Sequence, residues 1–305
     1  MRKLLAILLP CALLLSACGG SEGGSSEGAT SLDAVTVTQA GAGKAPKVEF
    51  ATPLELPETT AKVIKEGEGE GAKDGQWIRY RMSGFDATTG TQSNETYTAA
   101  GAQTLPVDES LKAGDPDLYN ALKGVKAGSE VAYYYKPAAS GTASEPAQHP
   151  QLVVLTVEDV KDKAVKADAA EVAALDKAGK LPEISFDSKG VPSVKLPEGH
   201  QAPEDLVVQV LKEGTGKTAT AKSTVKANYA GWNWGKGTEF DSSFARGEAA
   251  EFPLTGVIEG WTKGLAGLKE GSKVMLSIPA EMAYASGQGD AIGDLVFYVE
   301  LTDVK

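Results

Sequence analysis

The chain has 305 residues, with 41 acidic and 30 basic side chains and a formal net charge of −11. This length can hold two domains, each with its own hydrophobic core. The negative charge argues against nucleic acid as a partner and against electrostatic adhesion to an anionic membrane, because phosphates would repel the chain.

The first stretch is typical of a targeting segment. A basic pair at 2–3 precedes an apolar run at 4–15, which is too short to span a bilayer. The run leads into LSAC (15–18), which resembles a bacterial lipobox. The resemblance implies that 1–17 is a lipoprotein signal peptide, and that Cys18 is lipidated and anchors the chain outside the cytoplasm, on the bacterial cell membrane. The alternative is an ordinary secretory peptide with a chance cysteine.

After cleavage, Cys18 would be the single remaining cysteine, since Cys11 lies in the removed segment. A disulfide is therefore not expected within the chain. Residues 18–32 are rich in Gly and Ser and show no hydrophobic periodicity. This composition predicts a flexible tether that holds the folded part away from the membrane.

Three pairs of similar segments follow one another in the same order. The pairs are APKVEF (45–50) with VPSVKL (191–196), VIKEG (63–67) with VLKEG (210–214), and GVKAGSEV (124–131) with GLKEGSKV (267–274). A repeat of this length indicates duplicated domains rather than a solenoid. We place the first domain at 33–160 and the second at 182–305.

Residues 161–181 lie between the two copies and are rich in Ala, Lys and Asp. A weak apolar stripe predicts a linker helix here, with Val165, Ala169, Val172 and Leu175 on one face. Gly179 and Pro182 would end the helix. A disordered charged linker is the alternative.

The second copy reads as a mostly β domain with one helix. Its apolar patterns predict strands at 206–212, 224–232, 251–254, 273–278 and 295–301, and a helix at about 257–268. The alternation at 295–301 predicts a strand with one buried face. An antiparallel sheet wrapped around a short helix accounts for both the strand-like and the helix-like apolar patterns, and the fold class is α+β.

The second copy also carries an ordered series of motifs. They are ANYAG (227–231), FDSS (240–243), VIEGW (257–261), GLKEGSKV (267–274), P-x-x-x-A-Y (279–284) and LVFYVEL (295–301). From about 206 to 305 the chain thereby resembles the FKBP-type peptidyl-prolyl cis-trans isomerases. The resemblance implies two FKBP-like domains and a ligand pocket between sheet and helix in the second. It further implies proline-containing unfolded or secreted polypeptides as substrates, and allows macrolide inhibitors.

The resemblance also implies a role for individual side chains. Tyr229, Asp241, Trp261 and Tyr284 match the catalytic positions, and the substrate-binding walls match Phe240, Phe252, Val257, Ile258 and Phe297. Several of these residues have a simpler interpretation as core aromatics. Asp241 either steers the substrate carbonyl electrostatically or pairs with Arg246 and fixes its loop.

Other chemistries lack the residues they need. The sequence has no evident Ser-His-Asp set, no Cys/His metal spacing and no phosphate-binding or dinucleotide loop, so we expect neither a cofactor nor a metal. Rotation about an X-Pro bond requires none of these groups. A non-catalytic polypeptide-binding chaperone or assembly lipoprotein remains the alternative function.

The first copy lacks most of the pocket motifs. Alignment through the repeat places Met82 where Tyr229 stands and Leu118 where Trp261 stands. No FDSS and no Ala-Tyr element are found in it. We therefore expect the first copy to be a degenerate domain that keeps the fold and loses the site.

Overall fold

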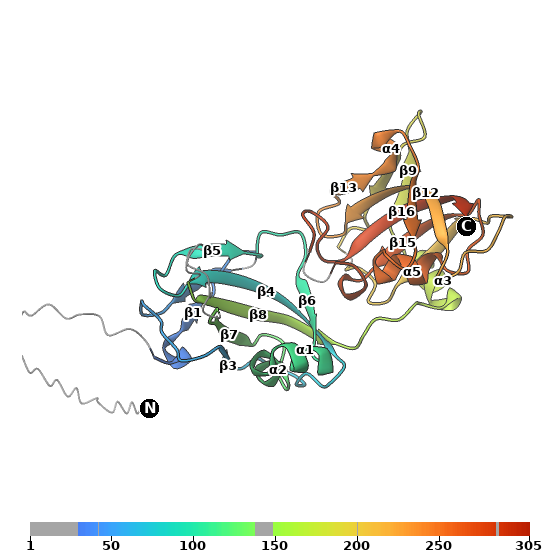
Figure 1. The fold of residues 1–305 in the computed structure, drawn as a ribbon. Coiled ribbons are helices and arrows are strands. Elements are labelled where there is room, and N and C mark those ends of the chain that lie inside the picture. The colour runs from blue at the N-terminus through green and yellow to red at the C-terminus, as the bar shows by residue number, and fades with distance from the viewer. Residues whose placement is uncertain (1–29, 42, 138–148, 200, 285–286) are drawn as a thin grey trace, which may run out of the picture.

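The computed structural model describes residues 30–41, 43–137, 149–199, 201–284 and 287–305, which form two lobes (Figure 1). The predicted signal peptide (1–17), the lipidation site Cys18 and most of the predicted tether (18–32) lie outside the described residues. Within the ranges given, none of the helices has both the length and the apolar character needed to cross a bilayer.

The N-terminal lobe contains a six-stranded antiparallel sheet with the order β3-β7-β8-β4-β5, and β6 pairs with β4. Its strands are β3 (Thr60–Lys65), β4 (Trp77–Asp86), β5 (Gln92–Glu95), β6 (Gln103–Pro106), β7 (Glu130–Tyr135) and β8 (Gln151–Lys161). Two short helices, α1 (Glu109–Gly114) and α2 (Pro116–Leu122), lie between β6 and β7. Tyr119 and Leu122 of α2 enter the core of this sheet.

The C-terminal lobe repeats this topology with the order β11-β15-β16-β12-β13, and β14 pairs with β12. Its strands are β11 (Val207–Lys212), β12 (Thr224–Asn233), β13 (Glu239–Ser242), β14 (Ala250–Pro253), β15 (Lys273–Ile278) and β16 (Leu295–Val304). Its helical segments are α4 (Ser243–Arg246), α5 (Glu259–Leu265) and the 3-10 turn η2 (Ala280–Met282). The prediction of an α+β chain with two antiparallel sheets is confirmed.

The register of the two sheets shows which positions correspond. Met82 lies opposite Leu155 across β4 and β8, and Tyr229 lies opposite Val299 across β12 and β16. The register of β4 and β8 shifts just before Tyr80, two residues before Met82. The register of β12 and β16 shifts just before Ala227, two residues before Tyr229. The two sheets therefore agree in strand order and in register, and they place Met82 at the position of Tyr229.

Small elements cover the outer face of each sheet. A 3-10 turn and a hairpin, η1 (Leu32–Ala34), β1 (Thr36–Thr38) and β2 (Lys47–Glu49), pack on the N-terminal sheet. Helix α3 (Ala169–Lys177) and the hairpin β9 (Glu183–Phe186) and β10 (Pro192–Lys195) pack on the C-terminal sheet. Each sheet thus buries apolar side chains on both faces.

The prediction of a one-sided strand at 295–301 is therefore wrong. Phe297 and Val299 face the core that contains α5, but Val296 and Tyr298 are equally buried on the other face. The reason is that α3 and the β9–β10 hairpin cover this face. Phe186 of β9 packs its ring edge-on against the ring of Tyr298, with 5.1 Å between the centroids.

Helix α5 is shorter than the predicted 257–268. It begins after Ile258, whose backbone is extended, and it ends before Gly267, whose φ of +91° few other residues adopt. Gly260 and Gly264 are buried on the face toward β15. Their missing side chains let the helix approach the sheet closely, and this approach places Trp261 inside the core.

We predict that Gly260→Ala destabilises the protein although alanine favours helices. A Cβ at this position would overlap the side chain of buried Ile278, and overpacking of this kind costs about 1–3 kcal/mol. Gly264→Ala is the matched control, because its Cβ would first meet the flexible end of Leu276 at 3.1 Å. Urea unfolding should show the larger loss for Gly260→Ala; equal losses would contradict the proposed close approach.

Candidate functional site

A cavity of about 290 Å³ opens between α5 and the inner face of the C-terminal sheet. It is lined by all nine residues that the sequence predicts for the pocket, together with two others, Gly256 and Gln288: Tyr229, Phe240, Asp241, Phe252, Val257, Ile258, Trp261, Tyr284 and Phe297. Strands β12, β13, β14 and β16, helix α5 and the segment after η2 all contribute to it.

Trp261 forms the centre of an aromatic cluster beneath the cavity. Its ring lies 5.4 Å from Tyr229, 5.2 Å from Phe252 and 5.4 Å from Phe297, and each pair meets edge to face. Such contacts add about 0.5–1.5 kcal/mol each beyond the area they bury. The floor of the cavity is therefore an ordered aromatic surface, in which Trp261 serves both the core and the pocket.

Phe240 extends this wall from β13. Its ring packs edge-on against Phe297 at 5.5 Å. Gly231 on β12 makes room for both rings, because a Cβ there would lie 2.7 Å from each. A glycine inside a strand weakens the strand, and here it gives space to the two aromatic side chains.

Asp241 is held in a network at the rim. The hydroxyl of Tyr229 and the guanidinium of Arg246 both donate to its carboxylate, and Arg246 also donates to the Tyr229 oxygen at 2.7 Å. The Arg246 group lies over the Tyr229 ring, 5.5 Å from its centre. Of the two interpretations of Asp241, this geometry favours pairing with Arg246, which fixes the position of Tyr229.

Burial and these contacts shift the pKa values of three side chains at the rim. Burial, reinforced by the hydrogen bond to Asp241, raises the pKa of Tyr229 to about 12. Burial alone would raise the pKa of Asp241, but the hydrogen bonds from Tyr229 and Arg246 outweigh it and the pKa falls below its usual range. Burial raises the pKa of Tyr284, and the charge of Asp241 adds to this. The carboxylate is therefore charged and the phenols are neutral at physiological pH.

Several residues that line the cavity carry a hydrogen-bond donor with no partner in the described part of the chain. Two of these donors are the hydroxyl of half-buried Tyr284 and the backbone N–H of Ile258, which precedes α5, and the buried indole N–H of Trp261 is another. Val257 and Ile258 form the apolar rim beside this N–H. A bound peptide would thus find an apolar surface and two hydrogen-bond donors for its carbonyls.

The sequence did not indicate Gln288 as a pocket residue. It lies in the loop after Tyr284, where Gln288 and Ala291 form an isolated bridge, and no periodicity marks such a position. Ile292 in the same loop is buried but does not line the cavity. Across the described ranges no group of three or more His, Cys, Asp or Glu side chains is placed to hold a metal ion.

Comparison with known proteins agrees with this geometry. Residues 215–302 match the family model of the FKBP-type peptidyl-prolyl cis-trans isomerases. A probable FK506-binding protein of Corynebacterium glutamicum is 42% identical over 113 residues, which is 36% of this chain and 95% of that relative. The isomerase FkpA of Escherichia coli is 47% identical over 103 residues, which is 33% of this chain and 38% of the relative.

A crystal structure of FkpA from Escherichia coli is also similar, with 38% identity, coverage of 45% of this chain and 58% of that chain, and a TM-score of 0.33. On the sequence matches, this chain belongs to the FKBP-type peptidyl-prolyl cis-trans isomerase family. It is an isomerase whose substrates are polypeptides that contain proline.

We predict an isomerisation rate that is independent of pH between about 5 and 9. Because the pKa of Asp241 is lowered and those of Tyr229 and Tyr284 are raised, none of the three changes charge in this window. The stability contributed by the Asp241 carboxylate is present above its unfolded pKa of about 3.9 and is lost only as the pH falls through its lower folded pKa. A pH–rate profile tests this; an inflection inside the window that Asp241→Asn removes would contradict it.

Proposed function

We propose that the cavity beneath α5 binds proline-containing segments of extracytoplasmic polypeptides and accelerates rotation about their X-Pro bonds. The observation that carries this proposal is the aromatic floor around Trp261, beside two donors that have no partner within the described residues. In this proposal Tyr229, Asp241, Trp261 and Tyr284 serve catalysis, and the remaining pocket residues hold the substrate.

The chemistry requires no nucleophile. Amide resonance sets the rotation barrier at about 18–20 kcal/mol, and the twisted transition state loses that resonance and part of its dipole. A dry apolar floor therefore favours the twisted amide over the planar one. Lowering the barrier by about 5 kcal/mol yields three to four decades of rate.

The donors act on the neighbouring amides. A hydrogen bond to the carbonyl of the rotating bond would strengthen its resonance and oppose the reaction. The Tyr284 hydroxyl and the Ile258 N–H instead bind the flanking carbonyls and hold the peptide in a bent shape. Asp241 contributes through its bonds to Tyr229 and Arg246, which keep the Tyr229 ring against Trp261.

We propose further that the N-terminal lobe is a degenerate copy of the same fold. The shared strand order and register put Met82, Leu105 and Val153 at the positions of Tyr229, Phe252 and Phe297. The sequence repeat aligns Leu118 of α2 with Trp261 of α5. All four are apolar and pack against the core of their own sheet, so the lobe keeps a core while it lacks the aromatic floor. Binding of unfolded chains is the role that such a lobe retains.

The place of action follows from the sequence. The apolar run at 4–15 and the lipobox-like LSAC support a lipidated Cys18 that anchors the protein on the outer side of the bacterial cell membrane. Macrolides that compete for the same pocket would act as inhibitors; one matched relative is named a probable FK506-binding protein. A chaperone that binds polypeptide without isomerising it is the second candidate, favoured by the duplicated lobe.

We predict that Tyr284→Phe in the full chain lowers kcat/KM for a prolyl peptide about three- to tenfold, the effect of losing one hydrogen bond to the substrate. Tyr298→Phe is the matched control, because it removes a hydroxyl that donates to Glu300 at 2.6 Å and belongs to the opposite face of the sheet. Protease-coupled or NMR exchange measurements provide the rates. Equal effects of the two variants would remove Tyr284 from the site.

The double variant Trp261→Leu/Tyr284→Phe tests the N-terminal lobe in the same assay. It gives the C-terminal site the leucine that the N-terminal lobe carries at position 118. Activity should fall to the uncatalysed rate while circular dichroism still shows folded protein. Turnover near the wild-type level would place a working site in the N-terminal lobe, and a wild-type chain that binds peptide without turnover would favour the chaperone.

A separate prediction concerns anchoring. Cys18→Ser should abolish lipidation, because serine offers no thiol for acylation, and should shift the protein from the membrane fraction to the soluble one or leave it uncleaved. Mass spectrometry of the N-terminal peptide from a bacterial host measures this. An unmodified, cleaved N-terminus in the wild-type chain would show that the lipobox interpretation is wrong.

A further inference from the structure

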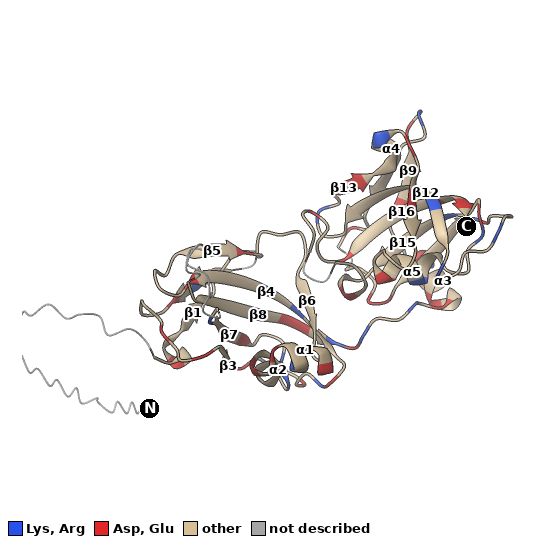
Figure 2. Ribbon diagram, viewed as in Figure 1, with Lys and Arg blue, Asp and Glu red and all other residues tan. Residues whose placement is uncertain are grey.

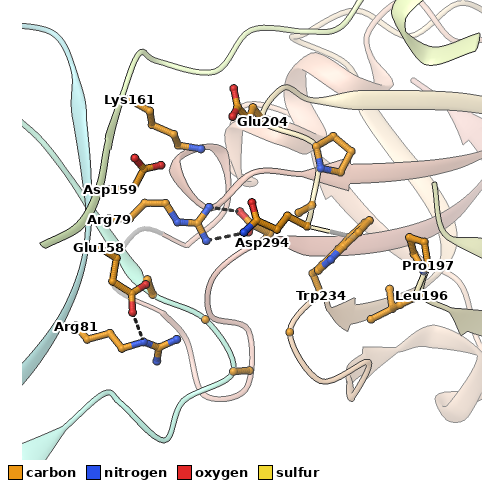
Figure 3. A pocket seen from close by; sticks show the side chains of 17 residues that line it. Arg79, Arg81, Glu158, Asp159, Lys161, Leu196, Pro197, Glu204, Trp234 and Asp294 are labelled. Atoms are coloured by element: carbon orange, nitrogen blue, oxygen red, sulfur yellow. Dashed lines mark hydrogen bonds and ion pairs between the residues drawn. The ribbon is translucent and has the colours of Figure 1, made fainter. Parts of the chain in front are cut away.

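The two lobes meet through close backbone contacts around a polar groove of about 730 Å³ (Figure 3). A Cβ on Gly101 of the N-terminal lobe would lie 2.5 Å from the Cα of Gly293, and a Cβ on Gly235 would overlap the carbonyl of Ala100. The ammonium of Lys236 donates to the carbonyl of Thr98 at 3.0 Å. The contact is therefore too close to admit side chains at these glycines.

Two ion pairs cross this junction. Arg79 of β4 makes two parallel hydrogen bonds to Asp294, at 3.1 and 2.9 Å, and the side chains are only 22% and 12% exposed. Lys161, the last residue of β8, lies 2.7 Å from Glu281 of η2, whose side chain is fully buried. Figure 2 shows acidic and basic positions on β4 and β8 where these strands approach the other lobe.

Asp294 joins the junction to the pocket segment. Its Oδ1 accepts from Arg79 and also from the backbone N–H of Ala280, at 3.0 Å. Ala280 begins η2, and Tyr284 follows two residues after η2 ends. One carboxylate thus connects the N-terminal lobe to the start of the segment that carries Tyr284.

The buried side chain of Glu281 lies beside two cations of the N-terminal lobe. Its Oε1 is 2.7 Å from the ammonium of Lys161, and the guanidinium of Arg79 is close enough to interact with it electrostatically, while neither carboxylate oxygen makes a hydrogen bond among the described residues. A buried carboxylate that loses its partner is strongly unfavourable. The C-terminal lobe therefore carries a charge that its neighbour neutralises.

These bonds hold the two described stretches 280–284 and 287–294 at their outer ends. Ala280 and Glu281 lie at its start and Asp294 at its end, and Tyr284 and Gln288 between them line the isomerase cavity. Gly293 rests against Gly101 of the N-terminal lobe. The C-terminal lobe also holds this segment, through hydrogen bonds from Asn233 to the Asp290 carbonyl and from the Trp234 N–H to the Asp294 carbonyl. The contacts with the N-terminal lobe add to these and act at both ends of the segment.

We propose that Arg79 and Lys161 are positioning residues for the isomerase site: they hold the stretches 280–284 and 287–294 so that Tyr284 and Gln288 face the bound peptide. Besides the proposed binding of unfolded chains, the N-terminal lobe then also completes the neighbouring pocket. This inference rests on the proposed function of the cavity.

The test compares Arg79 with a lysine of the same lobe in the full chain. Arg79→Met should lower kcat/KM for a prolyl peptide about five- to tenfold, mainly through KM, as expected for a coupling between two sites. Lys62→Met is the control, because Lys62 of β3 pairs with Asp33 inside the N-terminal lobe. Arg79→Lys keeps the positive charge but cannot make the two parallel hydrogen bonds to Asp294, so its activity should lie between those of Arg79→Met and the wild type.

Amide hydrogen exchange provides a readout that needs no activity. Exchange within 280–284 and 287–294 should accelerate in Arg79→Met and in Lys161→Met, and should stay at the wild-type rate in Lys62→Met. Unchanged exchange and unchanged KM in both Arg79→Met and Lys161→Met would overturn the positioning role. An inactive wild-type chain whose segment still loosens in these variants would instead refute only the proposed function of the cavity.

Discussion

The site depends on how closely α5 approaches β15. Two glycines on the helix face remove the side chains that would hold the elements apart, and Trp261 can then stand between them with its ring against three other aromatics. Edge-to-face packing fixes each ring by its neighbours, so the floor is rigid before any peptide arrives. A rigid apolar surface is what a reaction needs when its transition state differs from its ground state in shape and dipole rather than in covalent bonding.

The nine residues singled out from the sequence line one cavity because they fall within local motifs. Phe240 and Asp241 are adjacent in the chain, as are Val257 and Ile258, and the strand patterns supplied Tyr229 and Phe297. The sequence did not indicate Gln288 as a pocket residue, because its place in the pocket is set by a loop without periodicity. The sequence also did not predict that α3 and the β9–β10 hairpin cover the outer face of the sheet. Helix α3 has only a weak apolar stripe. Its contacts with the sheet join elements far apart in the chain, which a local pattern does not reveal.

If the N-terminal lobe is the degenerate copy proposed above, strand order and site chemistry have separated in this chain. Both sheets keep the same order, the same register shift and a hairpin on the outer face. These features are set by backbone pairing and by the burial of generic apolar side chains, which Met82 and Leu118 satisfy as well as Tyr229 and Trp261 do. The pocket needs more, because aromatic edges and hydroxyls at fixed positions are not interchangeable with aliphatic groups. A copy released from that requirement can retain its fold.

The junction between the lobes differs in kind from both cores. Close glycine contacts, two ion pairs and the Lys236–Thr98 hydrogen bond connect the lobes there. Paired buried charges contribute little net stability compared with apolar side chains of the same volume, yet the loss of one partner is costly. Such a junction specifies a geometry more than it adds stability. Arg79 and Lys161 contact Asp294 and Glu281, and Asp294 also accepts from the N–H of Ala280. The geometry that these bonds specify is therefore that of the segment carrying Tyr284.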